Sequence, residues 1–330
     1  MAQVAVIGGG VVGAAIAYEL TRRSQVEVTL IEGQTPASGS SGAALGVLMA
    51  VISQKVRGRA WQLRETSLRR YQTLLPELAA LTGQEIPANY QGLLRLRFPE
   101  EPLAPWEHLV TQRRTQGWPL EIWSREQLLA RCPHLQGQNI AGGIYSPQDL
   151  QVQPKALTEA LVTGARLQGA TCQFGVRVAA IVPQAAGYVL ETSAGTLKAD
   201  WVAIAAGLGS TPLTAGLPQP TRLQPVLGQA LQLKLPQPLG NPEFQPVISG
   251  HDVHLVPLGG GDYWLGATVE FPDDNGAIAA QEELLAQVWQ QGREFCPELG
   301  EAAVINTWFG LRPRPVGEPA PITCSFVPIP

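Results

Sequence analysis

The feature that most constrains this chain is a glycine-rich turn between an apolar run and a helix-like segment. Residues 3–7 form the apolar run, and glycines follow at positions 8, 10 and 13. In a β-α-β unit these glycines permit a tight turn, close approach of a pyrophosphate, and close packing of helix on strand. The N–H groups and dipole of the helix N-terminus also attract phosphate. The pattern predicts a dinucleotide site at Gly8, Gly10, Val11, Val12 and Gly13.

An acidic residue supports this interpretation. A second strand is predicted over residues 26–31, and Glu32 ends it, 19 residues beyond Gly13. A carboxylate at this place accepts hydrogen bonds from ribose hydroxyls and disfavours a 2′-phosphate, which argues against NADP. With a helix predicted over residues 11–23, we expect the two strands to be parallel and joined by a right-handed crossover.

Composition excludes several classes of protein. The chain has 330 residues, 45% of them hydrophobic and 15% charged, which indicates a globular protein of one large or two interleaved domains. A net charge of −4 disfavours a nucleic-acid partner. The four scattered cysteines are expected to be free thiols of a cytoplasmic protein. The N-terminus lacks the basic region of a signal peptide, and the apolar stretches are too short for stable membrane insertion.

The order of predicted elements indicates an α/β fold. Helices are expected over residues 58–81, from Pro154, and near 280–295. Strands are expected near 171–182, 188–192, 196–206, 224–234, 246–256, 262–270 and 303–309. This order predicts a Rossmann-like domain assembled from separate segments with an antiparallel-sheet domain inserted; the family resemblance given below implies that they are an FAD-binding domain and a substrate domain. We assign residues 1–85, 151–215 and 305–330 to the first domain, and residues 86–150 and 216–304 to the second.

A second glycine- and serine-rich segment spans residues 38–47. By itself it is typical of a flexible surface loop. Together with residues 6–13 and Glu32, its residues 40–44 resemble the FAD site of the D-amino-acid oxidase-like flavoproteins. The resemblance implies an FAD cofactor contacted here by Ser40, Ser41, Leu45, Gly46 and Val47. The cysteine that tethers flavin in sarcosine oxidases is missing near Arg312, so the FAD is expected to be noncovalent.

Two weaker patterns agree with that family. Residues 203–210 resemble its strand-to-loop motif beneath the flavin domain, with Gly207 at the turn. Val178 resembles the valine whose backbone meets the adenine. Without the resemblance, the two segments would be read as a buried strand ending in a glycine turn and as an ordinary strand valine.

An arginine near the end of the chain is the first candidate for substrate binding. Residues 309–315 predict a strand that delivers Arg312 into a proline-stiffened turn. A guanidinium binds a carboxylate through two parallel hydrogen bonds and thereby fixes its orientation. The segment resembles the G-L-R-P motif of glycine oxidases, which implies that Arg312 holds the substrate carboxylate. Arg314 is the next candidate, and an exposed arginine without a ligand is the simpler alternative.

Two histidines, His251 and His254, first suggest a metal site. Residues three apart on a strand point to opposite faces, and no third ligand is evident, so no metal is expected. Residues 251–257 resemble the glycine-oxidase strand H-D-x-x-Y-x-V-P, with His254 in place of the tyrosine that lies beside the substrate. The resemblance therefore implies that His254 contacts substrate.

The resemblance covers Val4 to Pro321 and is greatest to the glycine oxidases of the thiamine pathway. It implies FAD-dependent oxidation of glycine, or of another small amine or D-amino acid, to an imine that hydrolyses to the 2-oxo acid and ammonia. O2 would reoxidise the flavin to give hydrogen peroxide. Two alternatives stay open: a D-amino-acid, sarcosine or proline dehydrogenase with a quinone acceptor, and a flavin-binding protein with impaired catalysis. The oligomeric state is also open, a homo-oligomer included.

The last residues depart from the family. Its members continue into a strand, a G-H-x-x-x-G-like loop against the flavin pyrimidine, and a helix. Here Thr323 to Pro330 form a different ending, and no glycine follows Gly317. From this difference we expect weak FAD retention, low turnover, and either poor solubility or partnering through an exposed sheet edge.

Overall fold

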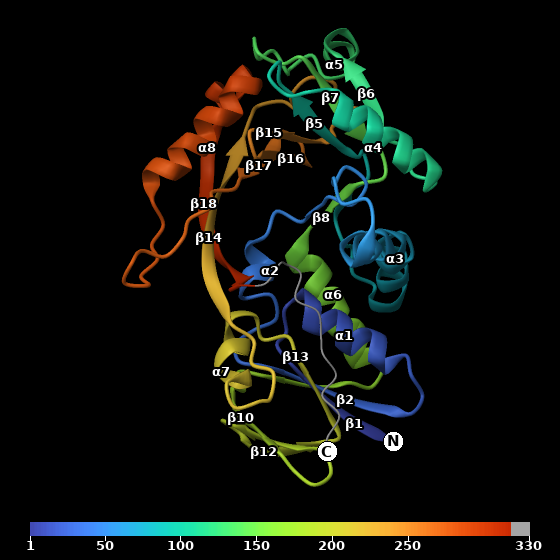
Figure 1. Ribbon diagram of the computed structural model, residues 1–330, viewed down its shortest axis with the longest axis vertical. Coiled ribbons are helices and arrows are strands. Elements are labelled where there is room, and N and C mark those ends of the chain that lie inside the picture. The colour runs from blue at the N-terminus through green and yellow to red at the C-terminus, as the bar shows by residue number, and fades with distance from the viewer. Residues whose placement is uncertain (318–330) are drawn as a thin grey trace.

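A four-stranded parallel sheet lies in the lower half of the computed structural model, which describes residues 1–317 (Figure 1). Its order is β13-β1-β2-β9. The strands are β1 (Ala2–Ile7), β2 (Val26–Glu32), β9 (Thr171–Phe174) and β13 (Trp201–Ile204). Residues 4–7 of β1 are buried, as expected for a strand covered on both faces. The predicted parallel pairing of β1 and β2 is confirmed.

Helices α1 (Val11–Thr21) and α6 (Pro154–Leu167) cover one face of this sheet. Their contact depends on small residues. Ala14 and Ala17 are fully buried, and a Cβ on Gly164 would lie 3.0 Å from the Tyr18 ring. The long helix α3 (Gly58–Thr82) packs beside α6. All three helices occupy the positions that the apolar spacing predicts, within a few residues at each end.

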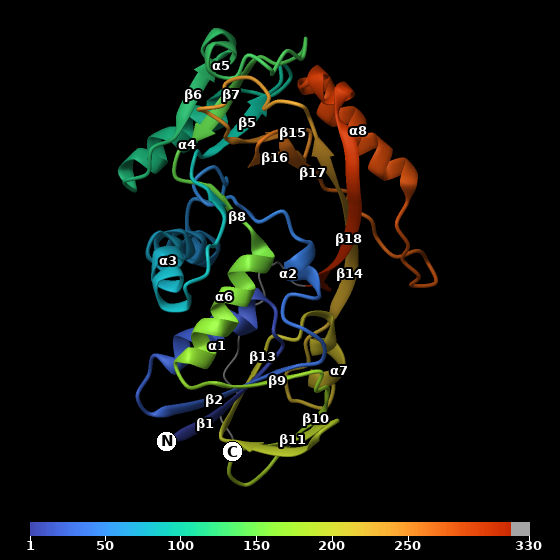
Figure 2. The same ribbon diagram turned by 180° about the vertical axis from the view of Figure 1, so that it is seen from behind.

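A three-stranded antiparallel sheet lies at the lower end of the molecule (Figure 2). It consists of β10 (Val178–Pro183), β11 (Tyr188–Thr192) and β12 (Gly195–Ala199). The single strands predicted over 171–182 and 196–206 are each two strands in different sheets. The chain leaves the parallel sheet after β9 and returns to it after Asp200. Sequence periodicity cannot detect such a break when both halves are apolar.

The upper half is an eight-stranded sheet of order β18-β14-β17-β16-β15-β5-β7-β6. All its pairs are antiparallel except β15 with β5. The strands are β5 (Leu93–Arg97), β6 (Glu121–Ser124), β7 (Gly142–Ser146), β14 (Leu223–Lys234), β15 (Val247–Gly250), β16 (Val253–Gly259), β17 (Asp262–Gly266) and β18 (Ala303–Pro315). The strand predicted over 246–256 is a hairpin, because His251 and Asp252 adopt φ of 51° and 65° at its turn.

The two faces of this sheet have different partners. Leu231, Leu255 and Leu265 face helix α8 (Glu282–Phe295) and share a core with its Val288 and Phe295. The alternate residues Ala230, Val247 and Val256 belong instead to the core that includes α1, α3 and α6. This second face is therefore turned toward the parallel-sheet half.

The remaining elements are short or peripheral. They are α2 (Ser40–Ala43), β3 (Val47–Leu48), β4 (Ala88–Asn89), α4 (Ala104–Thr115), α5 (Arg125–Arg131), β8 (Leu150–Val152), η1 (Gly207–Gly209), α7 (Ser210–Thr214) and η2 (Pro297–Glu301). Cys132, Cys172 and Cys296 are free thiols, as expected, and Cys324 lies outside the described residues. Among residues 1–317, no helix is long and apolar enough to cross a membrane.

The division into two domains stays a prediction. The element that bears on it is β18, which pairs with β14 along its length within the eight-stranded sheet, although residues 305–315 were assigned to the other domain. The ending at Thr323 to Pro330, on which the expectation of weak FAD retention depends, lies outside the described residues.

Candidate functional site

The glycine-rich turn has a shape that only glycine permits. Gly8 adopts φ +109°, and a Cβ there would lie 2.3 Å from the Ala205 carbonyl oxygen. A Cβ on Gly13 would lie 1.9 Å from the Gly8 carbonyl oxygen, so any side chain would push helix α1 away from the turn. The strand, turn and helix are thus packed as tightly as a dinucleotide fold requires.

Glu32 lies at the carboxyl end of β2, beside this turn. Its carboxylate accepts hydrogen bonds from the backbone N–H of Gly9 at 2.6 Å and of Gln34 at 2.8 Å. Val178 is the first residue of β10 and is buried in a cluster with Ile7 and Ile31. The two residues predicted to meet the adenosine half of the cofactor therefore come from neighbouring strands of different sheets.

The segment after β2 is more ordered than a flexible loop, because residues 40–43 form the short helix α2. The Ser41 hydroxyl accepts the N–H of Val11, the first residue of α1, at 2.9 Å. The Ser40 hydroxyl donates to the Leu311 carbonyl at 2.6 Å. This segment consequently connects the glycine-rich turn with β18 and the eight-stranded sheet.

The other residues predicted to bind cofactor lie on either side of that connection. Gly46 has φ +73°, and a Cβ there would lie 1.8 Å from the Val152 carbonyl oxygen. Leu45 is buried, with its carbonyl bonded to the Gln151 side chain at 2.9 Å, and Val47 pairs with Gln151 in the sheet. Gly207 begins the turn η1 after β13, with open space beside its Cα.

Sheet register places the predicted substrate residues on one face. Arg312 pairs with Val226 and Trp308 pairs with Ala230, without a bulge between them. Gly266 pairs with both Ala230 and His254, so the row of residues continues across β17 to β16. Because paired and alternate residues share a face, the side chains of Trp308, Arg312 and His254 lie on the same side of the sheet.

This face meets the α2 segment directly. The Trp308 indole N–H donates to the Ala43 carbonyl at 2.9 Å, and a Cβ on Gly310 would lie 2.3 Å from the Ala43 Cβ. The expected turn at Arg312 is not found, because β18 continues to Pro315. The reason is that β14 supplies twelve consecutive residues for pairing, and β18 follows it to the end.

The Arg312 guanidinium packs against the Thr268 carbonyl and Gly228, and we call these two groups the seat of Arg312. Its Nη2 donates to the Thr268 carbonyl at 3.0 Å, and a Cβ on Gly228 would lie 2.5 Å from that nitrogen. Its Nε and Nη1 have no hydrogen-bond partner among residues 1–317. The side chain is exposed overall, while the protein around its charged end lowers the pKa of Arg312 by desolvation. One of the five N–H groups of this cation is therefore used, and the other four remain for an anionic ligand.

His254 contributes a second polar group to this face. Its Nδ1 is buried and has no hydrogen-bond partner among the described residues. Burial lowers the pKa of His254, and the positive charge of Arg312 lowers it further, against an opposite effect of Asp252. His254 is consequently neutral at pH 7, with an unused ring nitrogen. His251 lies apart from it, stacked on Phe98 in the hairpin turn. Among residues 1–317 no cluster of metal-ligand type is present.

Two buried charges that sequence analysis did not single out shape the segment after β3. The Asp149 carboxylate accepts the N–H groups of Ala50, Val51 and Ile52 at 2.7–2.9 Å. The fully buried Arg113 donates to the carbonyls of Val51, Ser53 and Lys55, with its guanidinium 3.6 Å from the centre of the Trp61 ring. Asp149 acts on backbone groups about 100 residues earlier in the chain, so no local sequence pattern reveals its role.

This segment borders a cavity of about 390 Å³ against α3. The cavity contains neither Arg312 nor His254. It is lined by Leu48, Met49, Ala50, Leu63, Arg64, Ser67, Leu68 and Tyr71.

The fold and the glycine-rich turn define a dinucleotide-binding protein of the α/β class, and comparison with known proteins identifies its family. The family described as FAD dependent oxidoreductase, or DAO, matches residues 3–324. Glycine oxidase of Geobacillus kaustophilus is 30% identical over 311 residues, which are 94% of this chain and 81% of that protein. The crystal structure of glycine oxidase from that organism matches with a TM-score of 0.84 at 28% identity, covering 96% of this chain and 84% of that one.

A second relative has a different organisation. The bifunctional protein ThiO/ThiG of Synechocystis is 31% identical over 316 residues, 94% of this chain but 45% of that protein. This chain therefore spans less than half of that relative.

The chain belongs to the DAO family of FAD-dependent oxidoreductases, and its cofactor is FAD. The residues present fit that cofactor. At Gly8 and Gly13 a Cβ would meet a backbone carbonyl oxygen, so only glycine allows the tight turn that a pyrophosphate needs, and the Glu32 carboxylate and the Ser41 hydroxyl each accept a backbone N–H of the turn.

Proposed function

We propose that this protein oxidises the C–N bond of glycine or another small amino acid to an imine. The imine then hydrolyses to the 2-oxo acid and ammonia, and O2 accepts the electrons to give hydrogen peroxide. Bound FAD supplies the two-electron acceptor for the amine carbon. The relatives named glycine oxidase and ThiO support this proposal, and the latter supports a role in thiamine biosynthesis.

One observation carries the proposal. Arg312 and His254 lie on the face of the eight-stranded sheet that contacts α2, the segment that also touches the glycine-rich turn. A carboxylate held by the free donors of Arg312 would be oriented relative to the cofactor, and a fixed orientation is the protein's main contribution to such chemistry. The neutral ring of His254 would face the amino end of the same substrate. Water molecules could hydrogen-bond the same carboxylate and amino group, but they would not hold the substrate in one fixed orientation.

The proposed roles divide between the two halves of the molecule. The pyrophosphate would be held at Gly8, Gly10, Val11, Val12 and Gly13, the ribose by Glu32, and the adenine beside Val178. The flavin end would be contacted by Ser40, Ser41, Leu45, Gly46, Val47 and Gly207. Arg312 binds the substrate carboxylate and His254 contacts its amino group.

The test begins with the purified protein and its flavin absorbance, followed by a panel of amino acids. Glycine, sarcosine, D-alanine and D- and L-proline are each assayed for hydrogen peroxide and, separately, for reduction of a quinone-like dye. We expect peroxide with glycine or another small amino acid. Dye reduction without peroxide would replace O2 by a quinone acceptor, and flavin reduction by none of the panel would contradict the proposed substrate class.

A further inference from the structure

We propose that Glu270 is a positioning residue for substrate-carboxylate recognition: it fixes Thr268, and Thr268 fixes Arg312. This inference rests on the proposed function, in which Arg312 binds the carboxylate. Glu270 lies in the segment after β17, on the far side of Thr268 from the arginine, and touches neither substrate nor cofactor in this arrangement.

Glu270 is one of the most deeply buried carboxylates of the described chain, with 2% of its surface exposed. Three hydrogen-bond donors meet it. The Gln229 side-chain amide donates to Oε1 at 2.9 Å, the Thr268 hydroxyl also donates to Oε1, and the N–H of Gln281 donates to Oε2 at 3.0 Å. No cation among residues 1–317 forms an ion pair with it. Burying such a charge is costly, so its presence calls for an explanation beyond packing.

The hydrogen bonds leave Thr268 no rotational freedom. Its hydroxyl donates a hydrogen bond to Glu270 Oε1 and accepts one from the Gln229 N–H at 2.8 Å. Its own N–H donates to the Gln229 carbonyl at 3.1 Å. The remaining group of Thr268 is its carbonyl, which accepts Arg312 Nη2 at 3.0 Å. Glu270 therefore bonds the side-chain hydroxyl of Thr268, and Arg312 bonds its backbone carbonyl.

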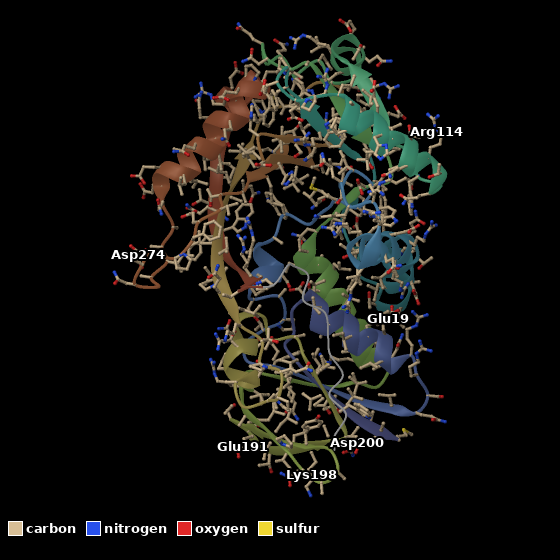
Figure 3. All side chains as sticks on the ribbon, viewed as in Figure 1. Glu19, Arg114, Glu191, Lys198, Asp200 and Asp274 are labelled. Carbon is tan, nitrogen blue, oxygen red and sulfur yellow. The ribbon has the colours of Figure 1, made fainter. Side chains whose placement is uncertain are left out.

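Glu270 also closes the loop that follows it. The bond to Gln281, the residue before α8, ties the two ends of residues 271–280, and Figure 3 shows Asp274 at the projecting tip of this loop. The Gln229 side chain adds a bond to the Gln281 carbonyl at 2.8 Å. Both ends of the loop are thus held by hydrogen bonds close to Thr268.

Only a carboxylate meets all three donors. In Glu270→Gln, the new amide NH2 would face either Gln281 N–H or the pair formed by Gln229 and Thr268. At least one contact would become donor against donor, and Thr268 would lose its fixed orientation. In Thr268→Val the hydroxyl is lost while the side-chain shape and the carbonyl remain. In Thr268→Ser the hydroxyl is kept.

The experiment measures binding without turnover. Acetate, a carboxylate with no amine to oxidise, is titrated into the FAD-loaded enzyme by calorimetry, and glycine kinetics are measured in parallel. We expect Glu270→Gln and Thr268→Val each to raise the acetate Kd and the glycine KM by about 2- to 30-fold, with kcat changed less. Thr268→Ser should resemble the wild type.

Two further variants make the result specific. Tyr263→Phe removes a buried hydroxyl that bonds Leu239 and Gln245 on the opposite face of the sheet, so it should lower thermal stability while leaving the acetate Kd unchanged. In an Arg312→Ala background, Glu270→Gln should produce no further loss of acetate affinity, because the group it positions is gone.

The outcomes separate the two proposals. An unchanged acetate Kd in Arg312→Ala would overturn the proposed substrate site itself. A raised Kd in Arg312→Ala with wild-type values in both Glu270→Gln and Thr268→Val would overturn the positioning role alone. Equal losses from Glu270→Gln with and without Arg312 would also overturn it. If Glu270→Gln fails to fold, Thr268→Val decides the matter by the same criteria.

Discussion

The glycine-rich turn and the Arg312 face are built in different ways. The turn lies within Gly8 to Gly13, and its geometry is set by what the backbone forbids: a Cβ at Gly13 would lie 1.9 Å from a carbonyl oxygen. The Arg312 face is assembled from β14, β16, β17 and β18, whose paired residues lie from 12 positions apart (His254 and Gly266) to 86 positions apart (Val226 and Arg312). Its geometry is set by register.

This difference determines how each region can fail. A steric requirement in a local turn is nearly all-or-none, because no rearrangement of neighbours relieves a backbone clash. A face built by register tolerates the loss of one side chain as far as folding is concerned, but it loses the specific contact that this side chain made. Changes in the turn should therefore abolish cofactor binding, and changes on the face should alter substrate binding while the cofactor stays.

The largest effect is expected at Gly13. In Gly13→Val, the added side chain would separate α1 from the strand and obstruct the diphosphate, so we expect no FAD in the purified protein. The measurement is the ratio of flavin to protein absorbance. Gly216→Val is the matched control, because nothing lies within 4 Å of its Cβ position, and it should keep its flavin. Stoichiometric FAD in Gly13→Val would contradict the assignment of the turn.

The next effect is expected at Arg312. In Arg312→Ala, the loss of a charge-assisted carboxylate contact costs about 2–5 kcal/mol, which raises KM by roughly 30- to several thousand-fold. FAD content should stay at the wild-type level, in contrast to Gly13→Val. Arg314→Ala is the control, because Arg314 lies on the same strand as Arg312. Its guanidinium is 5.1 Å from the centre of the Phe271 ring. If KM is instead raised in Arg314→Ala and unchanged in Arg312→Ala, the carboxylate site would be at Arg314.

The two regions also differ in how far sequence could predict them. The β-α-β unit was predicted closely because its pattern is contiguous: an apolar strand, three spaced glycines and an acidic residue at the end of the next strand. Arg312 was found only through a short motif, and its predicted turn was wrong, because the pairing partner that extends β18 lies some 80 residues earlier. The pairing of residues far apart has no signature in local periodicity.

Gly228 and Thr268 illustrate the same limit. Neither residue could be given a role from the sequence alone. Gly228 lies in a strand and has no positive φ, so its backbone conformation does not require glycine. The reason for a glycine there is the Arg312 guanidinium beside it, which only the structure shows. Likewise, a buried carboxylate such as Glu270 has no sequence pattern that distinguishes it from a surface residue, because its three donors come from three separate segments.

A smaller change on the Arg312 face is expected from Gly228→Ala. The new Cβ would lie 2.5 Å from Arg312 Nη2, and the flexible guanidinium would have to move off the Thr268 carbonyl. A displacement of about 1 Å can cost up to about 100-fold in substrate use, so we expect KM to rise by 10- to 100-fold with little loss of stability. Gly209→Ala, whose nearest contact would be 3.5 Å away, is the control. A KM unchanged in Gly228→Ala would show that the seat of Arg312 is not needed.

The smallest effect concerns protonation, and it contrasts the buried His134, which lies after α5, with the half-buried His254 of β16. Burial lowers the pKa of His134 to about 4, and burial and Arg312 lower that of His254 below its usual 6.5. Both are neutral at pH 7, and the unfolded chain takes up their protons first as pH falls. The free energy of unfolding should therefore decline from about pH 6.5 downward, and His134→Asn should reduce that decline without changing kcat/KM at any pH.

His254 should behave differently, because in the proposed function its ring faces the substrate. As pH falls through its lowered pKa, the ring gains a positive charge beside Arg312, loses its acceptor nitrogen and repels the substrate amino group. We expect kcat/KM to fall by about tenfold for one pH unit below that pKa, and His254→Gln, which does not titrate, to lack this decline. The measurement is kcat/KM between pH 5 and 8, with FAD content checked at each pH. A decline of equal size in His254→Gln would assign it to another group and leave His254 without a role in binding the amino group.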